Sequence, residues 1–321
     1  MAGDISEQKK RSKVSVYLKQ HEQMSAWLFF TIMATLVMYC SGYRGVALLH
    51  TPLLGIMLLY ILKLASLYIR RSTAWAVSCA FFALTPFCSA HPAELSMCLQ
   101  FVVLYHVLGW ARGKRAEFRP RHFFVLGMAA GVALLSRCGA EVFYIPVGLL
   151  MLWINRRHLL IALGMSIAGA ALPAAALATA TLSGVDLPHA EGEYTACLPV
   201  LLGVLVLFPA AAVTISRSHP ERRGFTMIML GLAFAGGAIL YGMGKMDFTS
   251  AICYFCSLAV PALVGVALLL HHRMSSWRGL YILRALCLLI PFATLCAVLI
   301  IPVYRSATSQ AAATPQPEQS H

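Results

Sequence analysis

Long apolar runs separated by short polar breaks dominate the sequence from residue 26 to residue 303. Most runs are about 15 to 25 residues long, close to the ~20 residues that an α-helix needs to cross a bilayer. The pattern predicts eleven membrane-spanning helices, at 26–42, 46–69, 73–89, 93–111, 122–136, 140–155, 158–182, 195–216, 224–242, 248–270 and 279–303. We therefore expect an all-α fold, a polytopic bundle of transmembrane helices.

The two ends of the chain differ from this central part. Residues 1–25 form a polar leader of mixed charge, and residues 304–321 are rich in Pro, Gln, Ser and Ala, a composition typical of disorder. The intervening transmembrane domain, 26–303, contains no long polar segment, because even the loop at 183–196 is too short to fold alone. Small-residue pairs at Gly127 and Gly131, at Gly164 and Ala168, and at Gly231 and Ala235 predict close helix–helix packing.

Composition supports a membrane protein. Hydrophobic residues make up 60% of the chain and charged residues only 12%, and the mean hydropathy is +0.75. A soluble protein of 321 residues has no core large enough to bury so much apolar surface.

The basic residues predict the orientation. With the amino terminus in the cytoplasm, nineteen Lys and Arg residues fall on the cytoplasmic side and four on the other. The cytoplasmic ones lie in the leader, at 70–71, 112–121, 156–157 and 217–223, and at 273 and 278. The positive-inside rule then places the carboxyl terminus outside. The net charge of +13 is explained by these topology signals and by contacts with anionic membrane lipids, so we expect no nucleic-acid partner.

Polar residues of a different kind gather on the outer side of this topology. Glu94 opens an apolar run just after His91 and Pro92, and Arg137 and Glu141 flank a tight turn. Glu94 either complements the positive end of a helix dipole or serves as a carboxylate inside a cavity. Arg137 either pairs with Glu141 or holds a phosphate. We expect Glu94 and Glu141 to point into the bundle, close to Arg137.

Motifs for other chemistry are missing from the sequence. The ten cysteines are scattered, mostly within apolar runs, where cysteine behaves as a small hydrophobe. No HExxH, GxSxG or Cys–His arrangement occurs, so we expect no metal site, and the sequence indicates no particular cofactor.

Residues 46–182 carry a recurring order of motifs. A basic pair ends one span in "LYIRRSTAW", and the next span reaches the outer face in "FFALTPFCSAHPAEL". A basic inner loop, "ARGKRAEFRPRH", precedes the short span "GMAAGVALLSR", and "EVFYIPVGLLMLWINRRH" follows. In this order the segment resembles the membrane module of the GT-C type glycosyltransferases, the superfamily of the protein O-mannosyltransferases and the lipid A aminoarabinose transferases. Residues 195–303 would add further helices.

The resemblance implies a protein of the bacterial inner membrane that binds a polyprenyl-phosphate-linked sugar at the outer face. Glu94 takes the place of an outer acidic residue of the family, and Arg137 that of the basic residue near the lipid phosphate. If transfer occurs, the resemblance makes Glu94 and Asp186 the candidate catalytic acids. The substrate-binding candidates are Arg137, Glu141, His91, Lys245 and Asp247.

One departure from the family leaves the activity open. The family uses a carboxylate in a long first external loop, whereas the corresponding loop "SGYRGVALLHT" has no acid. The chain is then either a reduced transferase or a non-catalytic relative that binds the lipid. Alternatives from other classes are a membrane assembly or binding subunit without enzymatic activity, and a small-molecule transporter. The transporter is disfavoured because the sequence shows no internal repeat.

The predicted orientation can be tested with single cysteines introduced into loops. A cysteine within 183–194 should react with an impermeant external reagent, whereas one within 112–121 or 217–223 should react only after the membrane is opened. Protection at 183–194 together with reaction at 112–121 would reverse the orientation.

Overall fold

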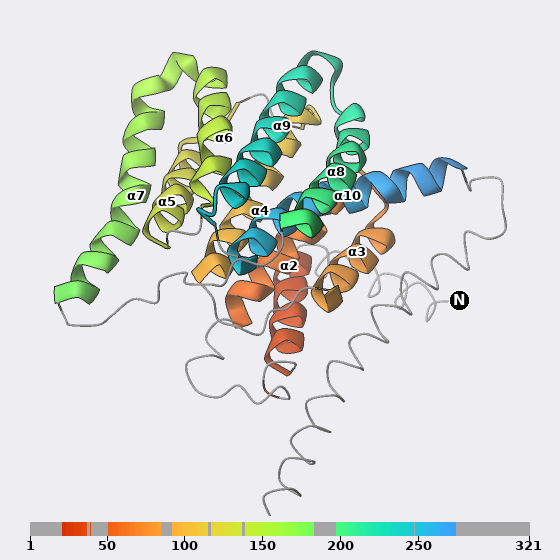
Figure 1. Cartoon of the computed structure of the whole chain (residues 1–321), viewed down its shortest axis with the longest axis horizontal. Coiled ribbons are helices and arrows are strands. Elements are labelled where there is room, and N and C mark those ends of the chain that lie inside the picture. Colours follow the sequence, from red (N-terminus) through yellow and green to blue (C-terminus); the bar gives the residue numbers. More distant parts are fainter. Residues whose placement is uncertain are drawn as a thin grey trace, which may run out of the picture. The chain divides into compact units, whose positions relative to one another are not determined.

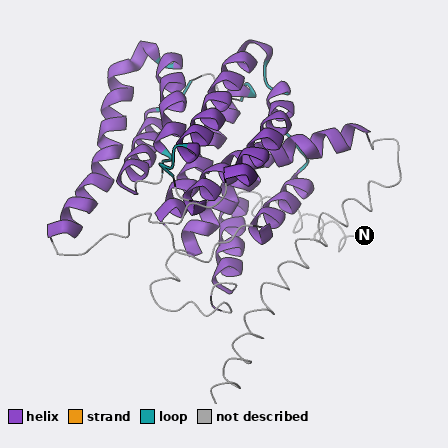
Figure 2. Ribbon diagram, in the orientation of Figure 1, coloured by secondary structure: helices purple, strands orange, loops and turns teal. Residues whose placement is uncertain are grey.

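The computed structural model describes residues 21–36, 39, 51–84, 92–114, 117–136, 139–182, 197–246 and 248–273. These residues form helices joined by turns, with no β-strand among them (Figure 2). The chain divides into two compact units, one of residues 1–59 with 297–321 and one of residues 60–296. The leader at 1–20, the tail and the expected helix at 279–303 lie outside the described residues.

The helices follow the apolar runs closely. They are α2 (Thr51–Ala65), α3 (Arg71–Leu84), α4 (Pro92–Ala111), α5 (Pro120–Ser136), α6 (Glu141–Ile154), the 3₁₀ turn η2 (Arg156–His158), α7 (Leu159–Leu182), α8 (Cys197–Ser216), α9 (Pro220–Gly242) and α10 (Phe248–Arg273). Each helix from α2 to α10 coincides with one expected span, and residues 21–36 are helical as well. The all-helical fold class is thus confirmed.

Among the described residues, three helical segments are long and apolar enough to cross a membrane, namely Ala93–Ala111, Arg156–Thr179 and Pro220–Gly242. Others are shorter than the ~20 residues that a perpendicular crossing needs. Helices α2, α5 and α6, for example, contain 15, 17 and 14 residues.

Proline and glycine set several helix ends. Pro92, Pro120 and Pro220 occupy the first residues of α4, α5 and α9, where a missing N–H costs no hydrogen bond and the fixed φ suits the helix. Gly113 after α4 and Gly244 after α9 have φ values of 77° and 68°, a left-handed conformation that side chains other than glycine rarely adopt.

The unit of residues 1–59 contains the helix at 21–36 and the first part of α2. The Trp27 indole donates a hydrogen bond to the Pro52 carbonyl oxygen, 3.2 Å away. The hydroxyl groups of Thr35 and Thr51 lie 3.0 Å apart. These contacts hold the two helical segments of this unit together.

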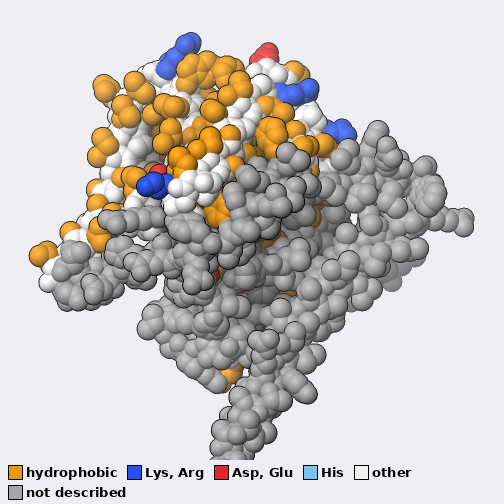
Figure 3. All heavy atoms as spheres, in the orientation of Figure 1, with side chains coloured by type: hydrophobic (Ala, Val, Ile, Leu, Met, Phe, Trp, Pro, Cys, Tyr) orange, Lys and Arg blue, Asp and Glu red, His pale blue; other side chains and the backbone are white. Residues whose placement is uncertain are grey.

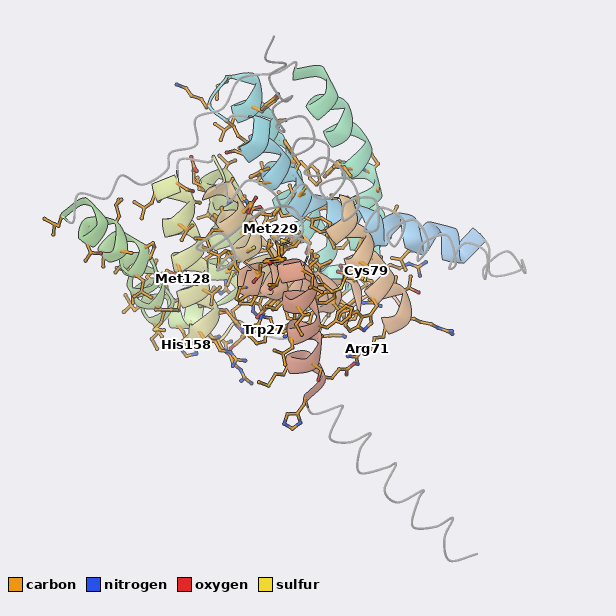
Figure 4. All side chains as sticks on the ribbon, turned by 90° about the horizontal axis from the view of Figure 1, so that it is seen from below. Trp27, Arg71, Cys79, Met128, His158 and Met229 are labelled. Atoms are coloured by element: carbon orange, nitrogen blue, oxygen red, sulfur yellow. The ribbon has the colours of Figure 1, made fainter. Side chains whose placement is uncertain are left out.

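Helix α4 is the interior helix of the unit of residues 60–296. Its apolar segment, Ala93–Ala111, is 83% buried, and the helix packs against α5, α6, α9 and α10. On another side, the Phe101 ring lies 5.4 Å from Phe81 of α3, and Tyr105 lies 5.6 Å from Tyr60 of α2. Met229 of α9 lies among these helices near the centre of Figure 4.

Helix α7 is peripheral, since only 11% of the apolar segment Arg156–Thr179 is buried. It runs along α5 (Figure 1). Small residues let the two backbones meet. A Cβ added at Gly127 would overlap the Ser166 carbonyl, and one at Gly169 would overlap the Phe124 carbonyl. The predicted role of Gly127 in packing is confirmed. The prediction for Gly164 is wrong, because nothing lies within 4 Å of a Cβ there; the contact uses Gly169 instead.

A second close pair joins α8 and α10. A Cβ added at Gly265 would overlap the Ala210 carbonyl, and the Thr214 hydroxyl donates to the Pro261 carbonyl oxygen. Both helix pairs therefore use small side chains to bring backbones together, which is the usual way for helices to associate in lipid.

Two single-methyl substitutions test the α5–α7 contact. Gly127→Ala should lower the free energy of unfolding by ~1 to 3 kcal/mol, because the methyl group meets a backbone carbonyl that cannot move alone. Gly164→Ala should be neutral or stabilising by up to ~1 kcal/mol, from helix propensity in open space. Thermal unfolding of both variants in the same detergent provides the measurement, and equal effects would contradict the packing described.

Candidate functional site

One end of the unit of residues 60–296 is built from the first turns of α4 and α6 and the last turn of α9; we term it the acidic end. The Tyr144 hydroxyl donates a hydrogen bond to the Ser96 carbonyl oxygen, 3.2 Å away, which joins α6 to α4. A Cβ added at Gly236 would overlap the Val142 side chain, so α6 also lies against the final turns of α9.

Glu94 stands in the first turn of α4 and is only 4% exposed. Its carboxylate lies beside the buried Cys98 thiol, one helical turn further on. The expectation that Glu94 points into the helices is confirmed. A negative charge in the first turn of a helix is stabilised by the macrodipole, which offsets part of the cost of burying it.

Glu141 takes the same position in α6, in the first turn. The residue is partly exposed, yet its Oε2 atom is buried and makes no hydrogen bond with the described residues. Elsewhere in this unit, the Tyr254 hydroxyl of α10 donates to the Ala233 carbonyl oxygen of α9, 2.6 Å away, which joins these two helices.

Two uncharged polar residues follow Glu94 along α4. Ser96 and Gln100 are one helical turn apart, so they share a face of the helix, and both are buried. The Ser96 hydroxyl and both amide atoms of Gln100 make no hydrogen bond with the described residues. A buried polar group without a partner costs about 1 to 3 kcal/mol, so this face is suited to a polar guest. The sequence analysis selected site residues by charge and by motif, so it missed Ser96 and Gln100. An amide side chain in the middle of an apolar run was the feature that could have identified Gln100.

The remaining predicted site residues fall into two groups. Lys245 is exposed just after α9, where its backbone N–H donates to the Leu240 carbonyl oxygen 2.9 Å away. The others, Arg137, His91, Asp186 and Asp247, lie outside the described residues. The structure thus brings Glu94, Glu141 and Lys245 to the acidic end. No cluster of three His, Cys, Asp or Glu side chains that could hold a metal occurs in the described part of the chain.

The opposite end, which we term the basic end, joins the turns at 66–70, 112–114, 117–119, 155–158 and 217–219. Arg112 donates to the carbonyl oxygens of Leu67 and Arg217, and the His219 N–H donates to the Ala111 carbonyl oxygen 2.9 Å away. Arg222 donates to the Trp110 carbonyl oxygen at 2.8 Å and lies 5.0 Å from that ring, a cation–π contact. Several Lys and Arg side chains line the upper edge of Figure 3, where Figure 1 places the α6–α7 and α8–α9 turns.

Tyr68 sits within this basic end, with its ring centroid 5.3 Å from the Arg112 guanidinium. Tyr68 thus acts as a packing surface for the Arg112 guanidinium.

Comparison with protein-family models, with curated proteins and with solved structures finds no match for this chain. The fold and the two ends define a class. The part of the chain that the structure describes is all helical, includes three helices long and apolar enough to cross a membrane, and separates its charged groups between an acidic and a basic end.

The unpaired amide of Gln100 gives a stability test with opposite signs for two variants. Gln100→Leu should raise the free energy of unfolding by ~1 to 3 kcal/mol, because it removes a buried group without a partner. Tyr144→Phe should lower it by ~1 kcal/mol, because it removes the hydrogen bond to Ser96. Destabilisation by Gln100→Leu would show that the amide is hydrogen-bonded in the protein.

Proposed function

We propose that the chain is a multi-pass protein of the bacterial inner membrane that binds a polyprenyl-phosphate-linked sugar at the outer face. In this proposal eleven helices cross the membrane, the amino terminus is cytoplasmic and the carboxyl terminus is outside. The observation that carries the proposal is the pair of acidic residues, Glu94 and Glu141, directed inward at the first turns of two neighbouring helices.

The distribution of charge supports this orientation. The described basic side chains near the basic end are Arg70, Arg71, Arg112, Lys114, Arg119, Arg121, Arg156, Arg157, Arg217, Arg222 and Arg223. The described carboxylates nearby are Glu117 and Glu221. Such an excess of Lys and Arg is typical of a cytoplasmic face, which leaves the acidic end for the outer face.

The chemistry of the acidic end suits a sugar. An ionised carboxylate is an acceptor only, and sugar hydroxyl groups are donors, so Glu94 and Glu141 would hold a sugar through charge-assisted hydrogen bonds. Lys245 is an exposed cation at this end, and in the proposal it and Arg137 contact the phosphate. The Gln100 amide and the Ser96 hydroxyl, which make no hydrogen bond with the described residues, lie on the next turns of α4 and add further polar contacts.

Binding, rather than transfer, is the activity that these residues support. Transfer to an acceptor hydroxyl needs a general base beside the donor, and the family carboxylate of the first external loop is missing. Glu94 then orients sugar hydroxyls, and the protein acts as a holder of the lipid-linked sugar.

Direct binding measurements test the proposal. Purified protein in nanodiscs should bind undecaprenyl phosphate carrying a sugar more tightly than sugar-free undecaprenyl phosphate. Glu94→Gln and Glu141→Gln should each lower the affinity for the sugar-bearing lipid about 10- to 100-fold, the range expected for hydrogen bonds to a charged group. Neither change should alter the affinity for the sugar-free lipid. Glu117→Gln, at an exposed site of the basic end, is the matched control and should have no effect.

Equal binding of the two lipids by the wild-type protein would contradict the proposal. If sugar transfer by the wild type were found, Glu94→Gln and Asp186→Asn should each reduce it by at least ~10²-fold, the scale of a lost general base. Transfer that survives both changes would remove Glu94 and Asp186 from the chemistry.

A further inference from the structure

The contact between α6 and α9 ends in an exposed aromatic pair at the basic end. The rings of Trp153 and Phe225 lie 4.7 Å apart between centroids, with an interplanar angle of 33°. Trp153 is 52% exposed and Phe225 is 45% exposed. Two large aromatic side chains that pack on each other and remain open are typical of the membrane–water interface, where amphipathic rings sit at headgroup level.

An exposed apolar strip continues from this pair toward the acidic end. On α6 the residues recur every fourth position, and on α9 they follow one another at intervals of three, four and seven positions, so each set forms one helical stripe. Their members are Ile145 and Leu149 on α6, and Ile228, Leu232 and Ile239 on α9. Val142 lies against Gly236 at the far end of the same seam, so the two stripes run side by side.

Arginines surround the aromatic end of the strip. Arg156 and Arg157 follow α6 directly, and Arg223 precedes Phe225 by two residues; all three are exposed. Asn155 holds the adjoining turn in place, because its side chain accepts from the Phe118 N–H at 3.0 Å and donates to the Phe118 carbonyl oxygen at 2.6 Å. Arg119 follows Phe118 directly, so this turn adds to the basic side chains at the end of α6. A cluster of arginines of this kind suits an anionic group.

We infer that this seam binds an anionic phospholipid of the cytoplasmic leaflet. The phosphate lies between Arg156, Arg157 and Arg223, the glycerol region lies on the Trp153–Phe225 pair, and the acyl chains lie along the apolar strip. The inference rests on the membrane insertion in the proposed function and is independent of the lipid-linked sugar.

The combination of features favours a lipid over a soluble anion. A soluble phosphate would use the arginines alone, whereas the strip below them offers apolar surface that only acyl chains or a hydrophobic helix would cover. The net positive charge of the rim complements an anionic headgroup, and basic sites between helices on the cytoplasmic side are typical headgroup sites.

Tryptophan quenching by brominated lipids tests the inference. The wild-type protein is placed in nanodiscs of phosphatidylcholine with a minor fraction of phosphatidylglycerol, identical in both leaflets, and either lipid carries brominated acyl chains. Brominated phosphatidylglycerol should quench more than an equal fraction of brominated phosphatidylcholine, and Trp153→Phe should abolish that excess, since it removes the reporting indole while retaining an aromatic ring.

A pair of matched double variants separates the site from general attraction. Arg156→Gln/Arg157→Gln should lower the preference for phosphatidylglycerol about 10- to 30-fold, given roughly 1 kcal/mol for each basic residue near an anionic surface. Arg70→Gln/Arg71→Gln removes the same charge from another exposed arginine pair near the same end and should leave the preference nearly unchanged.

Four results would overturn the inference. Equal quenching by the two lipids would mean ordinary boundary lipid, an equal loss in the two double variants would mean diffuse attraction, and full competition by soluble glycerol phosphate would mean a soluble-anion site. Shielding of Trp153 from both lipids would indicate a protein partner on the strip instead and would also overturn it. Because both leaflets are identical, these results do not depend on orientation, and Glu94-dependent binding of the sugar-linked lipid can succeed or fail separately.

Discussion

Helix α4 carries Glu94, Ser96 and Gln100 on a segment that is apolar and long enough to cross a membrane, and such side chains cannot face lipid at acceptable cost. This constraint explains why α4 is the most buried of the three candidate spans in the described part of the chain. Helices α5, α6, α9 and α10 surround it, so its polar groups meet protein. Helix α7 carries no acid and no amide, and its Ser166 hydroxyl donates to the Ala162 carbonyl oxygen within the same helix, so α7 can remain at the periphery.

Two kinds of contact hold this arrangement together. Glycines let α5 meet α7 and α8 meet α10 backbone to backbone, so that dispersion acts over short distances where no hydrophobic effect drives association. At the basic end, arginines donate to carbonyl oxygens of neighbouring turns and so satisfy backbone groups at helix ends. In the proposed topology the same charges also bias the orientation, so that one set of residues serves both stability and topology.

The sequence predicted the positions of the helices better than it predicted which helices pack against each other. Apolar runs located each helix within a few residues; α9 begins at Pro220, before its apolar run, because a proline and polar residues suit a first turn exposed to water. The sequence pattern indicated less clearly which face of each helix packs against another helix. Helix α7 is rich in small residues, so spacing favoured Gly164 although the contact uses Gly169. Gln100 carries no charge to reveal it, and the α6–α9 seam joins helices distant in the chain. The burial of Glu94 was predictable, because a carboxylate in an apolar run has to face inward.

Photolabelling from within the bilayer tests most directly the claim that polar α4 is surrounded by protein while α7 faces lipid. A phospholipid with a carbene-generating group in its acyl chain is photolysed with the wild-type protein in nanodiscs, and the adducts are mapped by mass spectrometry. The account predicts adducts on α7, at positions such as Leu160 and Ile167, and none between Met97 and Ala111 of α4. Labelling of α4 as strong as that of α7 would contradict it.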